Sequence, residues 1–308
     1  MFILAVVVLI GATAARFGVL TGETKDMLSR VIFNISLPLM LFSNFLKLDA
    51  TPRLIANSFT VVTVSFLVIL FMLIAGWAFS KIYKISTKEI PVFRTHSMFG
   101  NTIFLGFPLI AALYGEEGLL YASMFQLVST IMMWTVGVVV LTHGNGKTWK
   151  QSLRKVINPN TIATVAGLLL FMFSIKLPKI IITPLSELGS ANTWLSMLYI
   201  GALLVLSDVG GILKRKSIYL VSFNRLLLIP ALIISIFYLF GAVGGLTPDK
   251  LVASVIILEA SMPCMVTVVI MAKEMGSDDR QAAGNVFIST IISILTLPLV
   301  ALAVERFI

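Results

Sequence analysis

Long apolar segments recur from one end of this chain to the other. Among its 308 residues, runs of about 18 or more apolar residues are separated by short polar loops. A helix of that length crosses the hydrocarbon core of a membrane, which is about 30 Å thick. The chain is 58% hydrophobic and 12% charged, whereas a soluble domain carries about 25% charged residues. We therefore predict an all-α integral membrane protein without a separate soluble domain.

We divide the apolar segments into ten predicted transmembrane helices, numbered in chain order. Their expected bounds are 2–20, 31–48, 54–80, 93–113, 119–142, 160–176, 191–211, 217–241, 249–273 and 281–304. The first segment has neither the basic start nor the small-residue cleavage site of a signal peptide. We therefore interpret it as a retained span.

Most of the 23 lysine and arginine residues lie in the loops that follow odd-numbered spans. Cytoplasmic loops of membrane proteins carry such an excess of positive charge. This distribution predicts that both termini face the outside, and the opposite orientation is the alternative. It also explains the net charge of +9 without a nucleic acid partner.

Two predicted spans contain residues that interrupt a helix near the middle of the membrane. The first interruption is 97–102 (SMFGNT) in span four, and the second is 260–265 (ASMPCM) in span nine. Inside a helix, glycine costs about 1 kcal/mol and proline about 3 kcal/mol relative to alanine. Irregular backbone survives in a membrane only where protein or a water-filled cavity satisfies it. A matched pair of interrupted helices indicates the substrate site of a secondary transporter.

Short sequence matches in a conserved order predict an internal repeat. Residues 126–131 align with 286–291, and 114–117 align with 275–278, each after one of the interruptions. An odd number of spans in each half makes the second half inverted relative to the first. The predicted parts are a first five-helix repeat, a cytoplasmic linker and an inverted second repeat, over residues 1–145, 146–155 and 156–308.

The two interruptions also predict an anion site. If both helices open and cross, each leaves the positive N-terminus of a half-helix at the midplane. A carboxylate can then bind with no buried lysine or arginine nearby. The candidate substrate-binding residues at the interruptions are Gly100, Asn101, Thr102, Ser261, Pro263 and Cys264. The alternative is a simple kink, which we expect at Pro38, Pro108, Pro230 and Pro298.

Glu259 is the costliest polar residue within the predicted spans, because it precedes Pro263 by one helical turn in an apolar segment. Such a residue is a functional candidate by default. Burial favours its neutral form, which suits a role in proton or ion coupling. The alternative is a structural partner for Arg225 or for freed backbone. Arg225 itself lies near the cytoplasmic end of span eight, where we expect it to snorkel to the interface.

Three uncharged polar residues, Asn34, Gln126 and Asn285, lie within spans two, five and ten. They either join helices or line the substrate cavity. His96 and His143 are expected at the ends of spans, and Cys264 is the single cysteine, so we predict no metal site. Phosphate-binding and hydrolase motifs are also missing, which argues against a cofactor, ATP-driven transport and an enzyme.

Three segments resemble motifs of the auxin efflux carrier family. Residues 100–109 (GNTIFLGFPL) are similar to its fourth-span motif, and 34–38 (NISLP) to its second-span motif. Residues 262–264 (MPC), continuing to 272–274 (AKE), are similar to its ninth-span motif. The likeness covers essentially the whole chain. Because the long central cytoplasmic loop of plant members is missing, the chain resembles a compact prokaryotic member.

This resemblance implies the fold shared by bile-acid symporters and sodium/proton antiporters, with helices four and nine broken and crossed. Spans one, two, six and seven would form a scaffold domain and a homodimer interface. Spans three to five and eight to ten would form a transport domain. By motif position, Asn101 matches a substrate-contacting asparagine and Pro263 matches the crossover proline. Plant members have proline where this chain has Gly100.

The predicted function is therefore secondary active transport of small organic anions, such as malate, malonate or auxin-like acids, across the plasma (inner) membrane. The resemblance implies an elevator-type movement. Coupling to protons or sodium, or uniport driven by the membrane potential, stays open. The alternatives are a cation/proton antiporter of the same fold, a sodium-coupled organic-anion symporter, or a channel or sensor without active transport.

Overall fold

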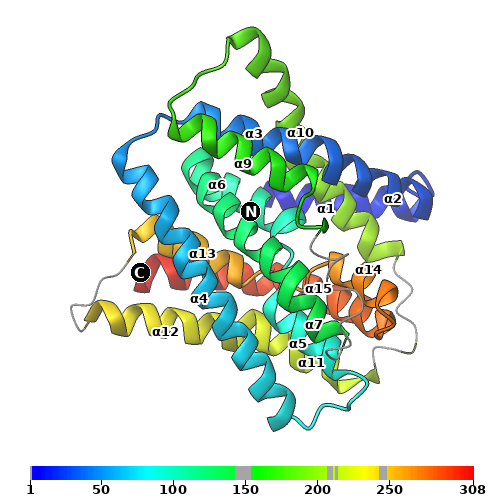
Figure 1. Cartoon of the computed structure of the whole chain (residues 1–308). Helices are drawn as coiled ribbons and strands as arrows, with labels where there is room; N and C mark the ends of the chain where they lie inside the picture. Colours follow the sequence, from blue (N-terminus) through cyan, green and yellow to red (C-terminus); the bar gives the residue numbers. More distant parts are fainter. Residues whose placement is uncertain (1, 143–153, 207–210, 212–213, 243–247) are drawn as a thin grey trace. The chain divides into compact units, whose positions relative to one another are not determined.

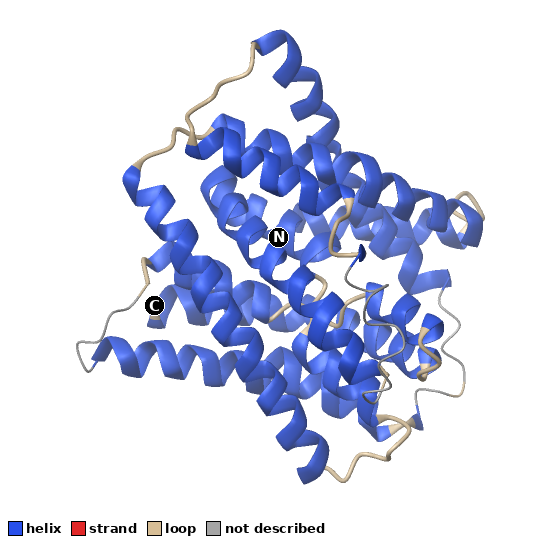
Figure 2. Ribbon diagram, viewed as in Figure 1, coloured by secondary structure: helices blue, strands red, loops and turns tan. Residues whose placement is uncertain are grey.

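The computed structural model describes residues 2–142, 154–206, 211, 214–242 and 248–308 (Figure 1). Within these ranges the regular elements are helices joined by loops (Figure 2). The predicted all-α class is confirmed for this part of the chain. His143 and most of the predicted linker 146–155 lie outside the described residues.

The helices follow one another along the whole described chain, and those labelled η are π-helices. The first group is α1 (Phe2–Arg16), α2 (Gly22–Val31), η1 (Ile32–Ser36), α3 (Leu37–Lys47), α4 (Pro52–Ile82), α5 (Ile90–Met98), η2 (Thr102–Gly106), α6 (Phe107–Met132), η3 (Met133–Gly137) and α7 (Val138–Leu141). The second group is α9 (Pro159–Met172), α10 (Lys179–Leu206), α11 (Lys216–Phe223), η6 (Asn224–Leu228), α12 (Ile229–Ala242), α13 (Lys250–Ala260), α14 (Thr267–Glu274) and α15 (Asp279–Phe307).

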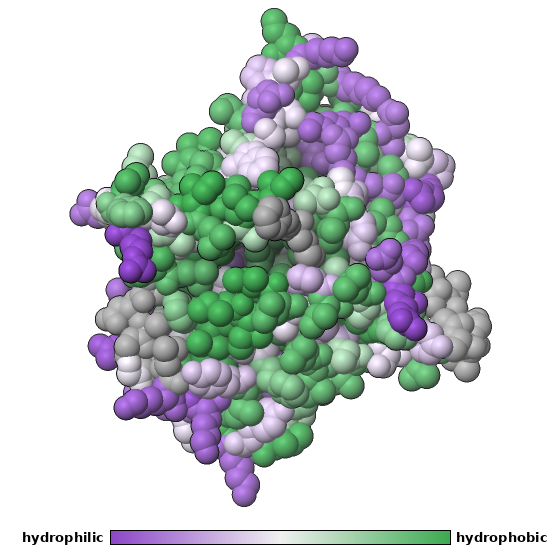
Figure 3. Space-filling model, turned by 180° about the vertical axis from the view of Figure 1, so that it is seen from behind, coloured by the Kyte–Doolittle hydropathy of each residue, from purple (hydrophilic) through white to green (hydrophobic). Residues whose placement is uncertain are grey.

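Several of these helices have the length and composition of membrane spans. Six candidates occur in the described residues: Gly22–Lys47, Pro52–Ile82, Thr102–Leu141, Lys179–Leu206, Lys216–Phe240 and Asp279–Phe307. α1 and α9 are shorter apolar helices. Hydrophobic side chains cover much of the face seen in Figure 3. Large hydrophobic residues of α15, such as Leu295 and Leu302, are exposed. The chain is thus a multi-pass membrane protein, and the count of ten spans stays a prediction.

Three π-helices end two residues before a proline. η1, η2 and η6 precede the prolines at positions 38, 108 and 230. Proline lacks an amide hydrogen, and its ring clashes with the carbonyl four residues earlier. A wider π turn at this point moves that carbonyl away from the ring. Pro298 differs, because it lies inside the continuous helix α15.

The chain folds into two compact units. The first consists of Met1–Val61, Ile103–Leu127 and Ile157–Ser207. Within it, α10 packs on α1 and α3, and α3 packs on α9. Glycine allows the close approach of α1 and α10, because a Cβ at Gly11 would overlap the backbone of Leu198.

The second unit consists of Val62–Thr102, Val128–Val156 and Asp208–Ile308. Its central helix is α15, which contacts α5, η6 and each helix from α11 to α14. α13 and α14 lie beside α15 in Figure 1. The residues of α13 from Val252 to Ala260 are all buried, so this helix is surrounded by protein rather than exposed to lipid. Three of the unit boundaries fall within α4, η2 and α6. The predicted scaffold and transport domains stay a prediction.

Two glycines adopt a left-handed backbone conformation at matching places in the predicted repeat. Gly115 interrupts α6 with φ +61°, between the predicted spans four and five. Gly276 has φ +70° in the connection between α14 and α15. Only glycine adopts positive φ without steric cost. The two residues occupy aligned positions in the segments 114–117 and 275–278.

Candidate binding site at two interrupted helices

Both predicted interruptions end a helix in the second unit. α5 ends at Met98, and the following residue, Phe99, has extended dihedral angles (φ −112°, ψ 125°). α13 ends at Ala260, three residues before Pro263. Proline removes the amide that would continue the helix, and Gly100 has a low intrinsic preference for helix. The local residue types therefore explain why α5 and α13 end where they do.

The two interrupted segments pair with each other. Gly100 and Cys264 form an antiparallel β-bridge. Two backbone hydrogen bonds flank it, from Asn101 N to Pro263 O (2.7 Å) and from Met265 N to Phe99 O (3.3 Å). Each segment thus satisfies backbone groups of the other, which the apolar interior requires.

Side chains from neighbouring helices satisfy further backbone groups of the second interruption. Ser289 Oγ in α15 accepts a hydrogen bond from Cys264 N at 2.9 Å. His96 Nε2 in α5 lies 3.2 Å from Met265 O, and its Nδ1 lies 3.0 Å from Asn285 Nδ2. A neutral imidazole with its proton on Nε2 would donate to Met265 O and accept from the Asn285 amide.

Arg225 joins the C-terminal ends of both interrupted helices. Its Nε donates to Met262 O at 2.8 Å, and its Nη1 donates to Ser97 O at 2.9 Å. These carbonyls lie where the helices stop and so lack their usual helical donors. The side chain is only 1% exposed. The expectation that Arg225 snorkels to the interface is therefore wrong, because its guanidinium finds acceptors inside the protein.

The expectation that no arginine is buried near the anion site is wrong for the same reason. The guanidinium also lies against Gly100, since a Cβ added at this glycine would overlap Arg225 Nη2 and come within 3.0 Å of Met262 Cβ. The first interruption therefore contains a residue without a side chain at the point where the guanidinium needs space.

Glu259, at the end of α13, is completely buried. Neither of its carboxyl oxygens accepts a hydrogen bond from a described residue. Arg225 interacts with it electrostatically. Unpaired buried carboxyl oxygens are costly, and neutralisation by a proton reduces that cost. The predicted coupling role of Glu259 stays a prediction.

Comparison with known proteins identifies the family of this chain. The sequence profile of a family described as "Membrane transport protein" matches residues 1–152 and 147–301. The chain belongs to this membrane transport family. The resemblance to auxin efflux carriers inferred from its motifs is thereby confirmed.

Two archaeal relatives of this transport protein cover nearly its whole length. An uncharacterized transporter of Methanocaldococcus jannaschii is 26% identical over 306 residues, covering 96% of this chain and 95% of the relative. An uncharacterized transporter of Methanothermobacter thermautotrophicus is 26% identical over 297 residues, covering 96% and 94%. Both names agree with the family and specify no substrate.

Most of the residues that were predicted from the sequence to form the site belong to the second unit of this transport protein. These are Gly100, Asn101, Thr102, Glu259, Ser261, Pro263, Cys264 and Asn285. All of them are buried. Ser261 Oγ donates to Ile257 O of its own helix at 2.6 Å, so its hydroxyl is already engaged.

Asn34 and Gln126 belong to the first unit. Asn34 is exposed, and its amide donates to Arg30 O one turn earlier at 3.0 Å. Gln126 is 6% exposed. Their predicted contact with substrate stays a prediction.

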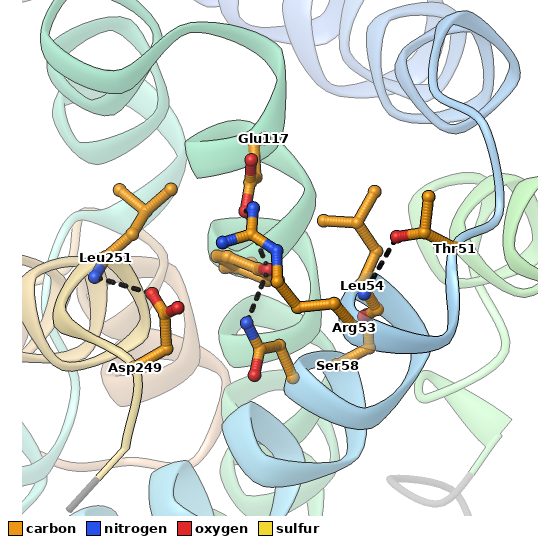
Figure 4. A network of polar contacts seen from close by, with 9 residues as sticks. Thr51, Arg53, Leu54, Ser58, Glu117, Asp249 and Leu251 are labelled. Atoms are coloured by element: carbon orange, nitrogen blue, oxygen red, sulfur yellow. Dashed lines mark hydrogen bonds and ion pairs between the residues drawn. The ribbon is translucent and has the colours of Figure 1, made fainter.

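A separate polar network of the first unit connects α4 and α6. Arg53 donates to Glu117 Oε1 at 2.7 Å (Figure 4). Tyr121 OH donates to the same oxygen at 2.9 Å, and Asn57 Nδ2 donates to Tyr121 OH at 3.0 Å. These contacts join the start of α4 to the middle of α6.

The sequence reasoning did not assign His96, Ser289 or Arg225 to the site. One signal for Arg225 was present, because charged residues within membrane spans almost always face the protein interior or a water-filled cavity. His96 directly precedes the first interruption and lies four residues, about one helical turn, before Gly100. Within the described residues, no cluster of three or more His, Cys, Asp or Glu side chains is arranged to hold a metal ion.

Proposed function

We propose that this protein is a secondary active transporter of small organic anions, such as malate, malonate or auxin-like carboxylates. The observation that carries the proposal is the pairing of Gly100 with Cys264 across two interrupted helices. Discontinuous helices of this kind form the substrate sites of secondary transporters, and their N-terminal ends favour anions. Membership of a membrane transport family supports the same class of function.

The finer features of the proposal follow from the family resemblance. They are ten spans in two inverted repeats, crossed helices four and nine, both termini outside, a homodimer in the plasma membrane and an elevator-type movement. The positive φ angles of Gly115 and Gly276 support the repeat. The division into two compact units supports a movement of one part of the chain against another.

The alternatives are a cation/proton antiporter and a sodium-coupled organic-anion symporter. Glu259 is the buried carboxyl group near the interruptions on which either mechanism would depend. An antiporter would move protons or sodium without an organic substrate. A symporter would lose organic-anion uptake when sodium is replaced by choline.

Uptake into proteoliposomes tests the function directly. The purified protein is screened with radiolabelled malate, malonate, succinate, lactate and indole-3-acetate, and thermal shift measures binding of the same compounds. We expect concentrative uptake and stabilisation by at least one carboxylate. If none of them binds or is transported, the organic-anion proposal is wrong. Downhill flux without concentration under an imposed gradient would favour a channel.

A matched pair of variants connects the transport to the site. Asn101→Leu changes the interruption, whereas Asn57→Leu changes the separate α4–α6 network. We expect Asn101→Leu to abolish uptake and Asn57→Leu to retain it. Equal loss in both variants would show that uptake reports general stability instead of this site.

Cysteine labelling tests the proposed orientation. Cys264 is the single cysteine and is buried, so its own reaction with maleimide is expected to be slow. A cysteine added at either terminus should react with a membrane-impermeant maleimide in intact cells, and one added at Lys88 should not. The reverse pattern would place both termini inside.

A further inference from the structure

We infer that Arg225 is a built-in cation, which fills the carbonyl site between the ends of the two interrupted helices and makes a metal ion unnecessary there. This inference concerns the coupling mechanism and rests on the proposed transport function only where uptake is measured. It assigns a positioning role to a residue that does not belong to either interruption. It also identifies the class of ligand that would replace Arg225, namely a small monovalent cation or a guanidinium ion.

The acceptors of Arg225 are those that a cation would use. Its two bonds, to Ser97 O and Met262 O, end on main-chain carbonyls of two different helices. In secondary transporters, unwound carbonyls and the C-terminal ends of half-helices coordinate sodium ions or protons. The negative ends of the α5 and α13 dipoles add to the attraction for positive charge. In this protein a guanidinium group occupies that position.

The surroundings of Arg225 are shaped for a guanidinium. Gly100 has no Cβ where Arg225 Nη2 lies. Arg225 belongs to η6, a π turn that ends two residues before Pro230, and this proline favours the wider turn from which the side chain extends. Gly100 and η6 are far apart in the sequence, and both contribute to the position of the Arg225 guanidinium.

The charge of Arg225 is held by main-chain carbonyls, because its hydrogen bonds go to Ser97 O and Met262 O and the oxygens of Glu259 accept none from a described residue. Glu259 and Cys264 are the groups that act electrostatically on the guanidinium. His96 also faces this region, where it contacts Met265 O and Asn285 Nδ2. A buried charge requires hydrogen-bonding partners. The two carbonyls supply them to the guanidinium, which thereby occupies the place that a bound cation would take.

Thermal stability of the purified full-length protein tests the inference without any substrate. The variant Arg225→Ala is compared with the wild type in sodium, guanidinium and choline chlorides at equal low concentration. We expect Arg225→Ala to have a lower midpoint, which guanidinium raises by a few degrees and choline does not. The wild type should show no difference between sodium and choline. If guanidinium leaves the variant unchanged, or if sodium stabilises the wild type, the inference is wrong.

Two further variants keep the test decisive. Arg94→Ala removes another arginine of the second unit, which donates to Ser80 Oγ, and should not respond to guanidinium. If Arg225→Ala does not fold, Arg225→Lys takes its place in the test. It retains a positive charge, so we expect it to fold without sodium. A sodium requirement in Arg225→Lys would contradict the inference.

Uptake then separates this inference from the proposed function. If a carboxylate is transported, its uptake by the wild type should be equal in sodium and choline media. Transport that requires sodium would overturn the built-in cation and leave the organic-anion function intact. If the wild type transports no tested carboxylate but guanidinium stabilises Arg225→Ala, the organic-anion function is wrong and the built-in cation stands.

Discussion

Gly100 provides the space that the Arg225 guanidinium occupies. Its own φ angle is not in the left-handed region. Glycine is therefore needed here because no side chain fits, and not because of its backbone conformation. A methyl group at this position would overlap Nη2 of Arg225 and lie within 3.0 Å of Met262 Cβ. The two residues are therefore coupled, although 125 positions separate them in the sequence.

The first prediction concerns this coupling. Gly100→Ala should destabilise the protein by about 1–3 kcal/mol, because the added methyl group overpacks a buried site. Gly22→Ala is the control, since a Cβ there meets nothing within 4 Å. Thermal denaturation in detergent measures both changes. An equal effect of the two substitutions would contradict the assigned role of Gly100.

A double-mutant cycle separates the guanidinium from the other neighbours of Gly100. In an Arg225→Ala background, Gly100→Ala should cost less than in the wild type, because the overlap with Nη2 no longer exists. The cost should not vanish, since Met262 still lies close to the added methyl group. Additive effects would show that the two residues are independent.

The sequence predicted the membrane class and the two interruptions because both follow from local chemistry. Apolar runs require lipid, and glycine or proline in such runs requires a partner for freed backbone. The position of Arg225 was not predictable in this way, because its acceptors belong to segments far from it in the chain. Snorkelling is the local expectation for an arginine near a span end, and tertiary structure overrides it. His96 was misplaced for a related reason, since span bounds are uncertain by several residues.

The second prediction concerns Ser289, whose hydroxyl accepts the hydrogen bond of Cys264 N. Ser289→Ala leaves a buried amide without its partner and should cost about 1–3 kcal/mol. Ser293→Ala is the control, because this buried serine of the same helix donates to Thr290 O within that helix. The midpoint of thermal denaturation should fall clearly more for Ser289→Ala. A larger loss for Ser293→Ala would contradict the pairing.

The third prediction concerns the left-handed glycines, Gly115 and Gly276. A Cβ at either position meets nothing within 4 Å, so the cost of substitution is that of the backbone alone. Alanine should destabilise by about 1–2 kcal/mol at each site, and asparagine should cost less because it tolerates positive φ better. Equal effects of alanine and asparagine in a thermal-shift series would contradict the left-handed conformation. Similar losses at both sites would agree with the predicted repeat.

The fourth prediction concerns Asp278, which precedes α15 outside the membrane span. Its Oδ2 accepts a hydrogen bond from Arg215 Nη1 at 2.6 Å, and its Oδ1 caps the helix by accepting one from Gln281 N at 3.0 Å. Burial acts to raise the pKa of Asp278. The hydrogen bonds from Arg215 and Gln281, with the charges of Arg215 and Lys88, outweigh it and hold the pKa below its ordinary value.

A carboxyl group with a lowered folded-state pKa stabilises the protein only while it is ionised. The contribution of Asp278 is therefore fully present above its unfolded pKa, about 4, and is lost as the pH falls through the lower folded-state pKa. Asp278→Asn keeps an oxygen for the cap but removes the charge, and should cost about 1 kcal/mol at pH 7. Asp278→Ala should cost about 1 kcal/mol more, because the cap is also lost.

Thermal denaturation from neutral to acidic pH separates the two contributions of Asp278. The difference between the wild type and Asp278→Asn should shrink at acidic pH, whereas the difference between Asp278→Asn and Asp278→Ala should change little. Arg215→Gln removes the cation and should make Asp278→Asn nearly neutral at pH 7. If the wild-type advantage over Asp278→Asn stays constant down to the lowest pH at which both proteins fold, the carboxylate charge is not its source.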